Sequence, residues 1–156
     1  MLPQDLWDKL LPFQRTGVLF AISRRGRALI ADDMGLGKTI QAISIACCYR
    51  YEWPCLVITP SSLRDDWVEG FKKWASSTVD PWKIKIVDKV ADMKEKGLVF
   101  VISYTLAARL VEDLKKKEFK VIIAVSSPSH KGAPTFFSEI KCCCCFVFSR
   151  RMNHIT

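Results

Sequence analysis

The protein is 156 residues long, with 24 lysine and arginine residues against 16 aspartate and glutamate residues and a formal net charge of +8. This length suits one globular domain with its own core, since 49% of the residues are hydrophobic, and two full domains would not fit comfortably. The positive charge makes polyanionic partners such as nucleic acid plausible, although a merely soluble basic surface explains it equally well.

The first ten residues, MLPQDLWDKL, lack a basic region followed by an apolar run, so they do not resemble a secretory signal. No uninterrupted apolar stretch approaches the roughly 18 residues that a membrane-spanning helix needs. We therefore expect an intracellular, reducing setting in which the seven cysteines are free thiols. Cys47, Cys48 and Cys55 fall within apolar segments, where cysteine acts as a small hydrophobic residue.

The first predicted helix covers residues 12–26, because Pro12 suits a first helical turn and Gly26 is a natural helix stop. A short apolar run at 28–31 then leads through a glycine-rich turn into residues 38–51, where apolar residues recur at helical spacing. The pattern predicts a strand, a loop and a helix in succession.

The alternation of strands and helices continues to residue 125. Runs rich in β-branched residues predict strands at 55–59, 84–87, 98–103 and 121–125. Amphipathic spacing predicts helices at 61–74 and 105–117. This alternation predicts an α/β fold with a doubly wound parallel sheet covered by helices on both faces.

Two of the helical segments carry side chains for which two roles compete. Core packing is favoured over base stacking for the aromatic residues that share one helix face, Trp67, Phe71 and Trp74. A solvated helix end is favoured over a DNA contact for the cations that close the helix at 105–117, Lys115, Lys116 and Lys117.

The ten residues from position 31 read ADDMGLGKTI and are similar to the phosphate-binding loop G-x-x-x-x-G-K-[ST], with Asp32 at the place of the first glycine. Gly35 and Gly37 let backbone N–H groups turn toward an anion, and the following helix points its positive end at the same place. Lys38 can reach the β- and γ-phosphates, and the Thr39 hydroxyl can join a Mg²⁺ shell. The preceding strand and following helix disfavour a chance Gly-Lys-Thr turn.

The segments LLPFQRTGVLFA, DDMGLGKTIQAISIA and LVITPSSLRDDW resemble the Q-motif, motif I and motif Ia of Swi/Snf-type ATPases in helicase superfamily two. In that family an aspartate commonly replaces the first glycine of the phosphate loop, so Asp32 matches the family's variant. EWPCLVITPSSLR is similar in particular to the annealing-helicase branch, the HepA-related proteins that rewind DNA and remodel stalled forks. The resemblance covers residues 10–124 and implies an incomplete RecA-like (P-loop) helicase lobe 1 and a nuclear role in DNA repair.

The resemblance implies an ATP site. Gln14 is expected to read the adenine edge, which suits an amide because adenine offers a donor and an acceptor side by side. From the residues alone, an exposed helical glutamine is the favoured interpretation of Gln14. The residues expected to hold the triphosphate are Asp32, Asp33, Met34, Gly35, Leu36, Gly37, Lys38 and Thr39, with Thr39 also a Mg²⁺ ligand.

The resemblance also implies contacts to the DNA backbone. The residues expected to make them are Pro60, Ser61, Ser62 and Leu63 of motif Ia, and Ser103 and Tyr104 after the next strand. Serine hydroxyls and N–H groups at a helix start suit phosphate. The alternative for Ser61 and Ser62 is that they simply cap the helix, and a Ser-Tyr turn at a strand end is common in any protein.

The sequence departs from the family after the strand at 121–125. There the family has an Asp-Glu pair that completes the Mg²⁺ shell and activates water, whereas this sequence continues VSSPSH, and no alignment of it restores a carboxylate. Loss of one preorganised catalytic group costs roughly 10²- to 10³-fold in rate. The family's second lobe supplies arginine fingers worth about 10³ to 10⁵, and we expect the chain to stop before that lobe. This polypeptide alone is therefore not expected to hydrolyse ATP usefully.

Residues 126–156 have no clear period and contain four consecutive cysteines, which predicts a divergent, disordered tail that follows a splice or read-through junction near residue 125. Four adjacent cysteines cannot readily reach one tetrahedral Zn²⁺, and no membrane-anchoring context supports palmitoylation. His130 and His154 have no ligand partners at a fixed spacing.

Three interpretations of the whole chain stay open. In the first, the chain is the ATP-binding amino-terminal part of a DNA-dependent ATPase. In the second, it is a non-catalytic short isoform that binds nucleotide or DNA and modulates the full-length enzyme. The third is a fragment that does not fold stably, because the loss of strands beyond residue 125 leaves one edge of the sheet uncovered.

Overall fold

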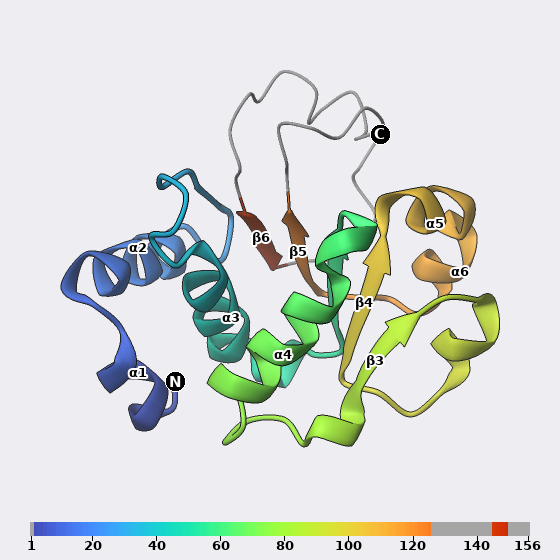
Figure 1. Ribbon diagram of the computed structural model, residues 1–156, viewed down its shortest axis with the longest axis horizontal. Helices are drawn as coiled ribbons and strands as arrows, with labels where there is room; N and C mark the ends of the chain where they lie inside the picture. Colours follow the sequence, from blue (N-terminus) through green and yellow to red (C-terminus); the bar gives the residue numbers. More distant parts are fainter. Residues whose placement is uncertain (1, 126–144, 150–156) are drawn as a thin grey trace.

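A computed structural model of the protein describes residues 2–125 and 145–149 (Figure 1). Its helices are α1 (Gln4–Lys9), α2 (Pro12–Ser23), α3 (Lys38–Cys48), α4 (Arg64–Trp74), α5 (Tyr104–Arg109) and α6 (Val111–Lys116). Its strands are β1 (Ala28–Ile30), β2 (Cys55–Thr59), β3 (Ile84–Val87), β4 (Val99–Ser103), β5 (Val121–Val125) and β6 (Cys145–Ser149). Short 3₁₀ turns include η2 (Ser61–Leu63) and η4 (Val90–Lys94).

The strands form one sheet in the order β1-β6-β5-β2-β4-β3. Strands β5, β2, β4 and β3 are parallel, and their register places Thr59 opposite Ser103 and Ile58 opposite Ala124. The carboxyl ends of these strands therefore meet at one edge of the sheet. The expected parallel α/β sheet is confirmed for these four strands.

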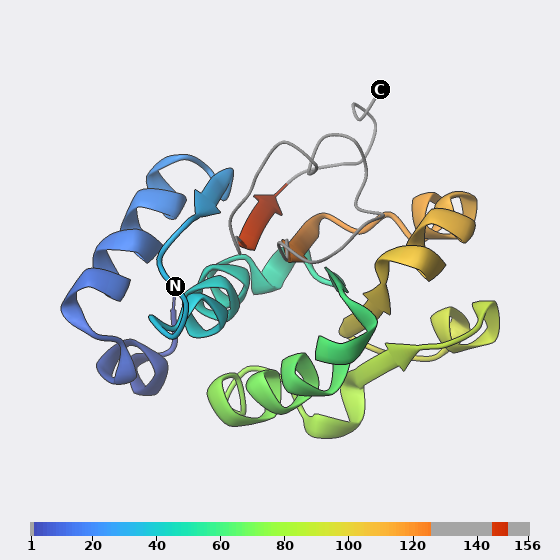
Figure 2. The same cartoon turned by 45° about the horizontal axis from the view of Figure 1, so that its top comes forward.

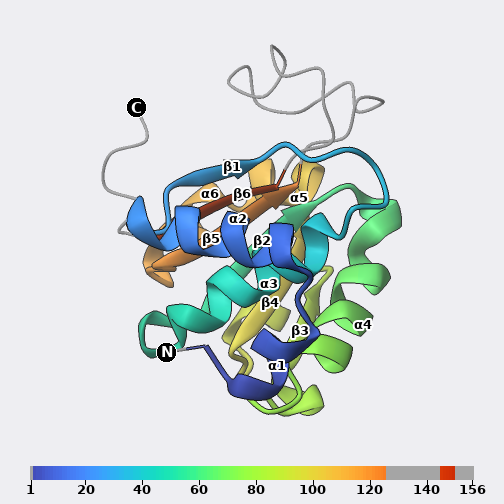
Figure 3. The ribbon, with the colours of Figure 1, turned by 90° about the vertical axis from the view of Figure 1, so that its left-hand side faces the viewer.

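Helices cover both faces of the sheet (Figures 2 and 3). Along β2, Cys55 and Val57 pack into one core with residues of α3 and α4, whereas Leu56, between them, packs into a second core with residues of α5 and α6. This alternation is the period of two that a strand imposes on its side chains. Trp67 and Phe71 are buried in the first core, which confirms the expected core packing for these two, and Trp74 is partly buried against the same core.

The helices predicted at 12–26 and 38–51 each end three residues early, at Ser23 and Cys48, and two other helical predictions differ more from the structure. A single helix at 105–117 is wrong, because the chain breaks at Leu110 (φ −107°, ψ 22°) between α5 and α6. Leu110 is buried, and the acidic residues Glu112 and Asp113 that follow it suit the start of a new helix. The predicted helix at 61–74 begins with the 3₁₀ turn η2, and α1 was not predicted.

Strand β6 was not predicted either. It runs antiparallel to both neighbours, with Val147 opposite Ala28 of β1 and opposite Ile123 of β5. The expectation that the sheet edge beyond β5 is uncovered is therefore wrong. The rest of the predicted tail, at 126–144 and 150–156 with both histidines, lies outside the described residues. Within the described residues, no helix is both long and apolar enough to cross a membrane.

Candidate nucleotide and nucleic-acid site

The loop between β1 and α3 holds the Lys38 side chain. Its ammonium Nζ donates hydrogen bonds to the carbonyl oxygens of Asp32 and Asp33, both at 2.8 Å, and the residue is 8% exposed. A buried ammonium needs such acceptors. Lys38 is also the first residue of α3, so its charge lies beside the positive end of that helix. The loop thus places a lysine and a helix start together, an arrangement suited to a polyphosphate.

Gly37 and Gln14 contact each other closely. Gly37 precedes α3 in the left-handed conformation (φ 78°), and a Cβ there would lie 2.5 Å from Nε2 of Gln14. Gln14 Nε2 donates to the carbonyl oxygen of Leu36 at 3.0 Å, and its Oε1 accepts from the N–H of Leu11 at 3.0 Å. Gln14 therefore ties the start of α2 to the phosphate loop.

The structure corrects one interpretation of Gln14. Its side chain is buried rather than exposed on the helix, and both ends of its amide bind the chain itself. Its contact with the loop agrees with a place in a nucleotide site. Its role in reading adenine stays a prediction.

Gln41 holds the beginning of the loop and was missed by the sequence analysis. Its Nε2 donates to Oδ2 of Asp32 at 2.6 Å, and the residue is 1% exposed. Helix α2 approaches so closely that a Cβ at Gly17 would lie 2.3 Å from Oε1 of Gln41. The signal available in the sequence is the position of Gln41 three residues after Lys38, on the same helix face. A glycine at position 32 would offer no carboxylate to Gln41, so Asp32 has a structural role in this loop.

The remaining loop residues differ in exposure. Asp33, Met34, Gly35 and Leu36 are exposed, with Met34 at 84%, whereas Thr39 is half-buried. The described residues contain no group of three His, Cys, Asp or Glu side chains that could hold a metal ion. A triphosphate with Mg²⁺ would meet the Thr39 hydroxyl here, whereas of the two carboxylates of the loop Asp32 is bonded to Gln41 and Asp33 is exposed.

The residues expected to contact DNA lie at the edge where the parallel strands end. Pro60 is buried, and Ser61 and Ser62 are exposed in the turn η2. The alternative that these serines cap the helix is wrong: α4 begins at Arg64 after Leu63, with no side-chain cap hydrogen bond. Their hydroxyls therefore face solvent at the sheet edge.

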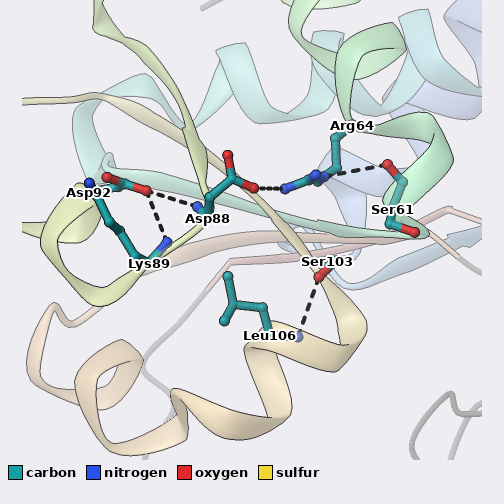
Figure 4. Close-up of polar contacts among 7 residues, drawn as sticks. All are labelled: Ser61, Arg64, Asp88, Lys89, Asp92, Ser103 and Leu106. Carbon is teal, nitrogen blue, oxygen red and sulfur yellow. Dashed lines mark hydrogen bonds and ion pairs between the residues drawn. The ribbon is translucent and has the colours of Figure 1, made fainter.

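Ser103 and Tyr104 follow β4 at the same edge. Ser103 caps α5, because its Oγ accepts the N–H of Leu106 at 3.3 Å (Figure 4). Tyr104 is buried, and its hydroxyl donates to the carbonyl oxygen of Val125 at 2.7 Å, at the end of β5. The structure brings both residues near motif Ia, but the Tyr104 side chain contacts the protein interior rather than solvent.

Beside motif Ia lies an ion pair that the sequence analysis missed. The Arg64 guanidinium pairs with the carboxylate of Asp88, which follows β3, and Arg64 Nε donates to the carbonyl oxygen of Ser61 at 3.4 Å (Figure 4). Asp92 Oδ2 accepts the N–H groups of Asp88 at 2.9 Å and of Lys89 at 3.0 Å. The hydrogen bond from Asp88 contributes most to holding the pKa of the Asp92 carboxyl below its ordinary value.

The lysines at the end of α6 do not act as one cluster. Lys115 and Lys116 lie exposed in the last turn of α6, at the predicted helix end, and their role there stays a prediction. Lys117 lies over the Phe100 ring, with Nζ 3.9 Å from its centroid, and donates to the carbonyl oxygen of Met93. Partial burial lowers the pKa of Lys117.

Comparison with known proteins agrees with this geometry. The family profile described as "SNF2-related domain" matches residues 13–125, from the start of α2 to the end of β5. The chain belongs to the SNF2-related family. The SNF2-related domain seen here is 29% identical to the structure of the Sulfolobus solfataricus SWI2/SNF2 ATPase core in complex with dsDNA, with a TM-score of 0.58, over 73% of this chain and 25% of that one.

Two relatives are similar over most of the chain. One is the SWI/SNF-related matrix-associated actin-dependent regulator of chromatin subfamily A-like protein 1 of Bos taurus, 50% identical over 83% of this chain and 14% of its own length. The other is the human DNA annealing helicase and endonuclease ZRANB3, 43% identical over 89% of this chain and 13% of its own length. The SNF2-related chain thus spans about one seventh of these relatives.

Proposed function

We propose that this chain is the N-terminal ATP-binding part of a Swi/Snf-type DNA-dependent ATPase that acts in the nucleus in replication-fork remodelling or DNA repair. The observation that carries the proposal is the placement of the Lys38 ammonium inside the loop, at the start of α3, beside Gly37. Similarity to a DNA annealing helicase and to an ATPase core bound to dsDNA supports the DNA-dependent part.

In this proposal the described residues bind nucleotide rather than hydrolyse it. The Lys38 ammonium exchanges two carbonyl acceptors for phosphate oxygens, which a charged acceptor favours. Gln14 and Asp32 hold the two ends of the loop in place for that exchange. Mg²⁺, when bound beside Thr39, supplies charge neutralisation to the phosphates.

A second candidate function has its own observation. The residues after β5 are Ser126, Ser127 and Pro128, so the chain offers no carboxylates where the family has its Asp-Glu pair. This favours a non-catalytic short form that binds nucleotide or DNA and modulates the full-length enzyme.

Nucleotide-dependent thermal stabilisation tests the proposal. ATP at about 100 times its dissociation constant is expected to stabilise the chain by about 2.7 kcal/mol. Lys38→Ala is expected to remove most of this stabilisation, because it removes the charge that meets the phosphates. Since Ser126, Ser127 and Pro128 replace the family's Asp-Glu pair after β5, chelation of Mg²⁺ is expected to change ATP affinity less than Lys38→Ala does.

Lys96→Ala is the matched control, because it makes the same charge change at an exposed site between η4 and β4. Equal loss of stabilisation in the Lys96 and Lys38 variants, or no stabilisation of the wild-type chain, would contradict nucleotide binding by the loop. Anisotropy of labelled duplex DNA with the wild-type chain tests the DNA part separately.

A further inference from the structure

The ion pair of Arg64 and Asp88 joins two segments at the carboxyl edge of the sheet. Arg64 is the first residue of α4, directly after the turn η2, and Asp88 directly follows β3. Both β2 and β3 pair in parallel with β4, so η2 and the loop after β3 flank the end of β4. Figure 4 shows the Arg64 and Asp88 side chains pointing toward one another across this edge.

The two partners differ in exposure. The Arg64 side chain is 24% exposed and the Asp88 side chain is 67% exposed. The guanidinium is thus partly enclosed and braced by the Ser61 carbonyl, whereas its carboxylate partner lies largely in water. A pair of this kind contributes little to stability and opens readily.

The backbone at Asp88 is held in position. Asp92, in η4, accepts hydrogen bonds from the N–H groups of both Asp88 and Lys89, so the loop after β3 is closed on itself. This hydrogen bonding fixes where the Asp88 carboxylate leaves the main chain. The carboxylate is therefore presented to Arg64 by a defined loop rather than by a chance contact.

We propose that Arg64 is a DNA-backbone contact and that Asp88 occupies its guanidinium when DNA is absent, as an intramolecular competitor of phosphate. The inference rests on the proposed DNA binding and adds its regulation. A carboxylate and a phosphodiester both present a pair of oxygens, and a guanidinium binds such pairs in a forked geometry. The exposed hydroxyls of Ser61 and Ser62 lie immediately before Arg64, so a phosphate that displaces Asp88 meets additional donors.

Other charges surround this pair. Asp65 and Asp66 are exposed in the first turn of α4, and Lys89 is exposed next to Asp88. The two acids repel any anion near α4, but the ion pair of Arg64 is made with Asp88. Removing an acid from α4 therefore measures the general effect of charge, and removing Asp88 measures that effect plus the release of Arg64.

The test uses the full chain and a fluorescein-labelled duplex DNA, followed by anisotropy at several salt concentrations. Asp88→Asn is expected to tighten binding about two- to fivefold more than the charge-matched control Asp65→Asn, the range set by the weakness of exposed ion pairs. Arg64→Gln is expected to weaken binding and to reduce the slope of log affinity against log salt by about one. Arg64→Lys should keep the wild-type dependence on salt but only part of the wild-type affinity, because lysine keeps the positive charge without the forked guanidinium donors.

A double variant shows whether Asp88 competes with phosphate for Arg64 or acts only through its negative charge. In an Arg64→Gln background, Asp88→Asn is expected to tighten binding no more than Asp65→Asn does. An unchanged advantage of Asp88→Asn in that background, or equal effects of the two single substitutions, would overturn the inference while DNA binding itself stands. If neither the wild-type chain nor Asp88→Asn binds duplex, the inference and the proposed DNA binding fail together. Circular dichroism and thermal midpoints identify any variant that fails to fold.

Discussion

Gly37 is subject to two constraints at once. Its φ of 78° lies in the left-handed region, and a Cβ would lie 2.5 Å from the Gln14 amide. Gly35 shares the first constraint, with φ 85°, but nothing lies within 4 Å of a Cβ there. A side chain at Gly35 would therefore meet backbone strain alone, whereas a side chain at Gly37 would also meet a steric conflict with Gln14.

Alanine substitution of each glycine tests this distinction. Gly35→Ala is expected to lower the free energy of unfolding by about 1 to 2 kcal/mol, the cost of a left-handed alanine. Gly37→Ala is expected to cost measurably more and to break the Gln14 contact with Leu36. Urea denaturation measures both values, and equal losses in the two variants would show that Gln14 moves aside without cost.

The thiols of Cys47 and Cys55 are buried and free. Burial raises the pKa of Cys47 to about 12 and raises the pKa of Cys55 as well. The folded state therefore keeps both protons at a pH where an unfolded chain, with thiol pKa values of about 8.5, releases them. Ionisation of these thiols in the unfolded chain therefore favours unfolding only above about pH 8.5.

This linkage predicts a pH dependence. The contribution of the two thiols is expected to be constant below about pH 8 and to lower stability as the pH rises from 8.5 to 10, by at most about 1.4 kcal/mol per pH unit for each thiol. Comparison of the wild-type chain with the Cys47→Ala, Cys55→Ala double variant in urea isolates this term from other groups. Parallel pH profiles for the two proteins would contradict it.

At the scale of elements, β6 connects the phosphate loop to the rest of the sheet. Strand β1, which leads into the loop, has β6 as its neighbour in the sheet, and β6 in turn pairs with β5. The described part of the chain thus links Ala28–Ile30 to the four parallel strands through Cys145–Ser149. We therefore expect the position of the loop to depend on a strand more than a hundred residues later in the sequence.

Proline at the centre of β6 tests this dependence. Val147→Pro removes one backbone N–H from the strand that pairs with both β1 and β5, and we expect it to destabilise the fold by at least about 2 kcal/mol. Amide hydrogen exchange at residues 28–30 should accelerate, and ATP affinity should fall. Lys96→Pro, at an exposed position outside β6, is the control. Unchanged exchange at β1 in the Val147 variant would show that β6 does not hold it.

At the scale of the whole molecule, the chain combines the phosphate loop with Ser126, Ser127 and Pro128 at the place where the family resemblance predicts an Asp-Glu pair. We expect no DNA-stimulated ATP hydrolysis by this chain above that of its Lys38→Ala variant, because each missing catalytic group costs roughly 10²-fold or more. A version extended through a complete Asp-Glu motif and a second lobe should hydrolyse ATP in the same assay. Turnover by the short chain that Lys38→Ala abolishes would contradict the prediction.

Much of the fold was predictable because its signals are local. The apolar runs of β2, β3, β4 and β5, and the spacing of apolar residues in α3 and α4, are set by neighbours in the sequence. The break at Leu110 was not predicted, because the apolar period of the helix continues through it. Strand β6 was missed because a short apolar run among cysteines does not show where it will pair.

By itself, the amino-acid sequence determined the phosphate loop, the alternation of strands and helices, and the family, since each depends on residue types at short, fixed spacings. The tertiary structure alone decided which side chains meet: Gln14 with Leu36 across 22 positions, Tyr104 with Val125 across 21, and Arg64 with Asp88 across 24. Parallel strands bring their carboxyl ends to one edge regardless of their separation in the chain. For that physical reason the contacts of Tyr104 with Val125 and of Arg64 with Asp88 follow from the sheet, and that of Gln14 with Leu36 follows from the packing of α2 against the phosphate loop, rather than from any local pattern.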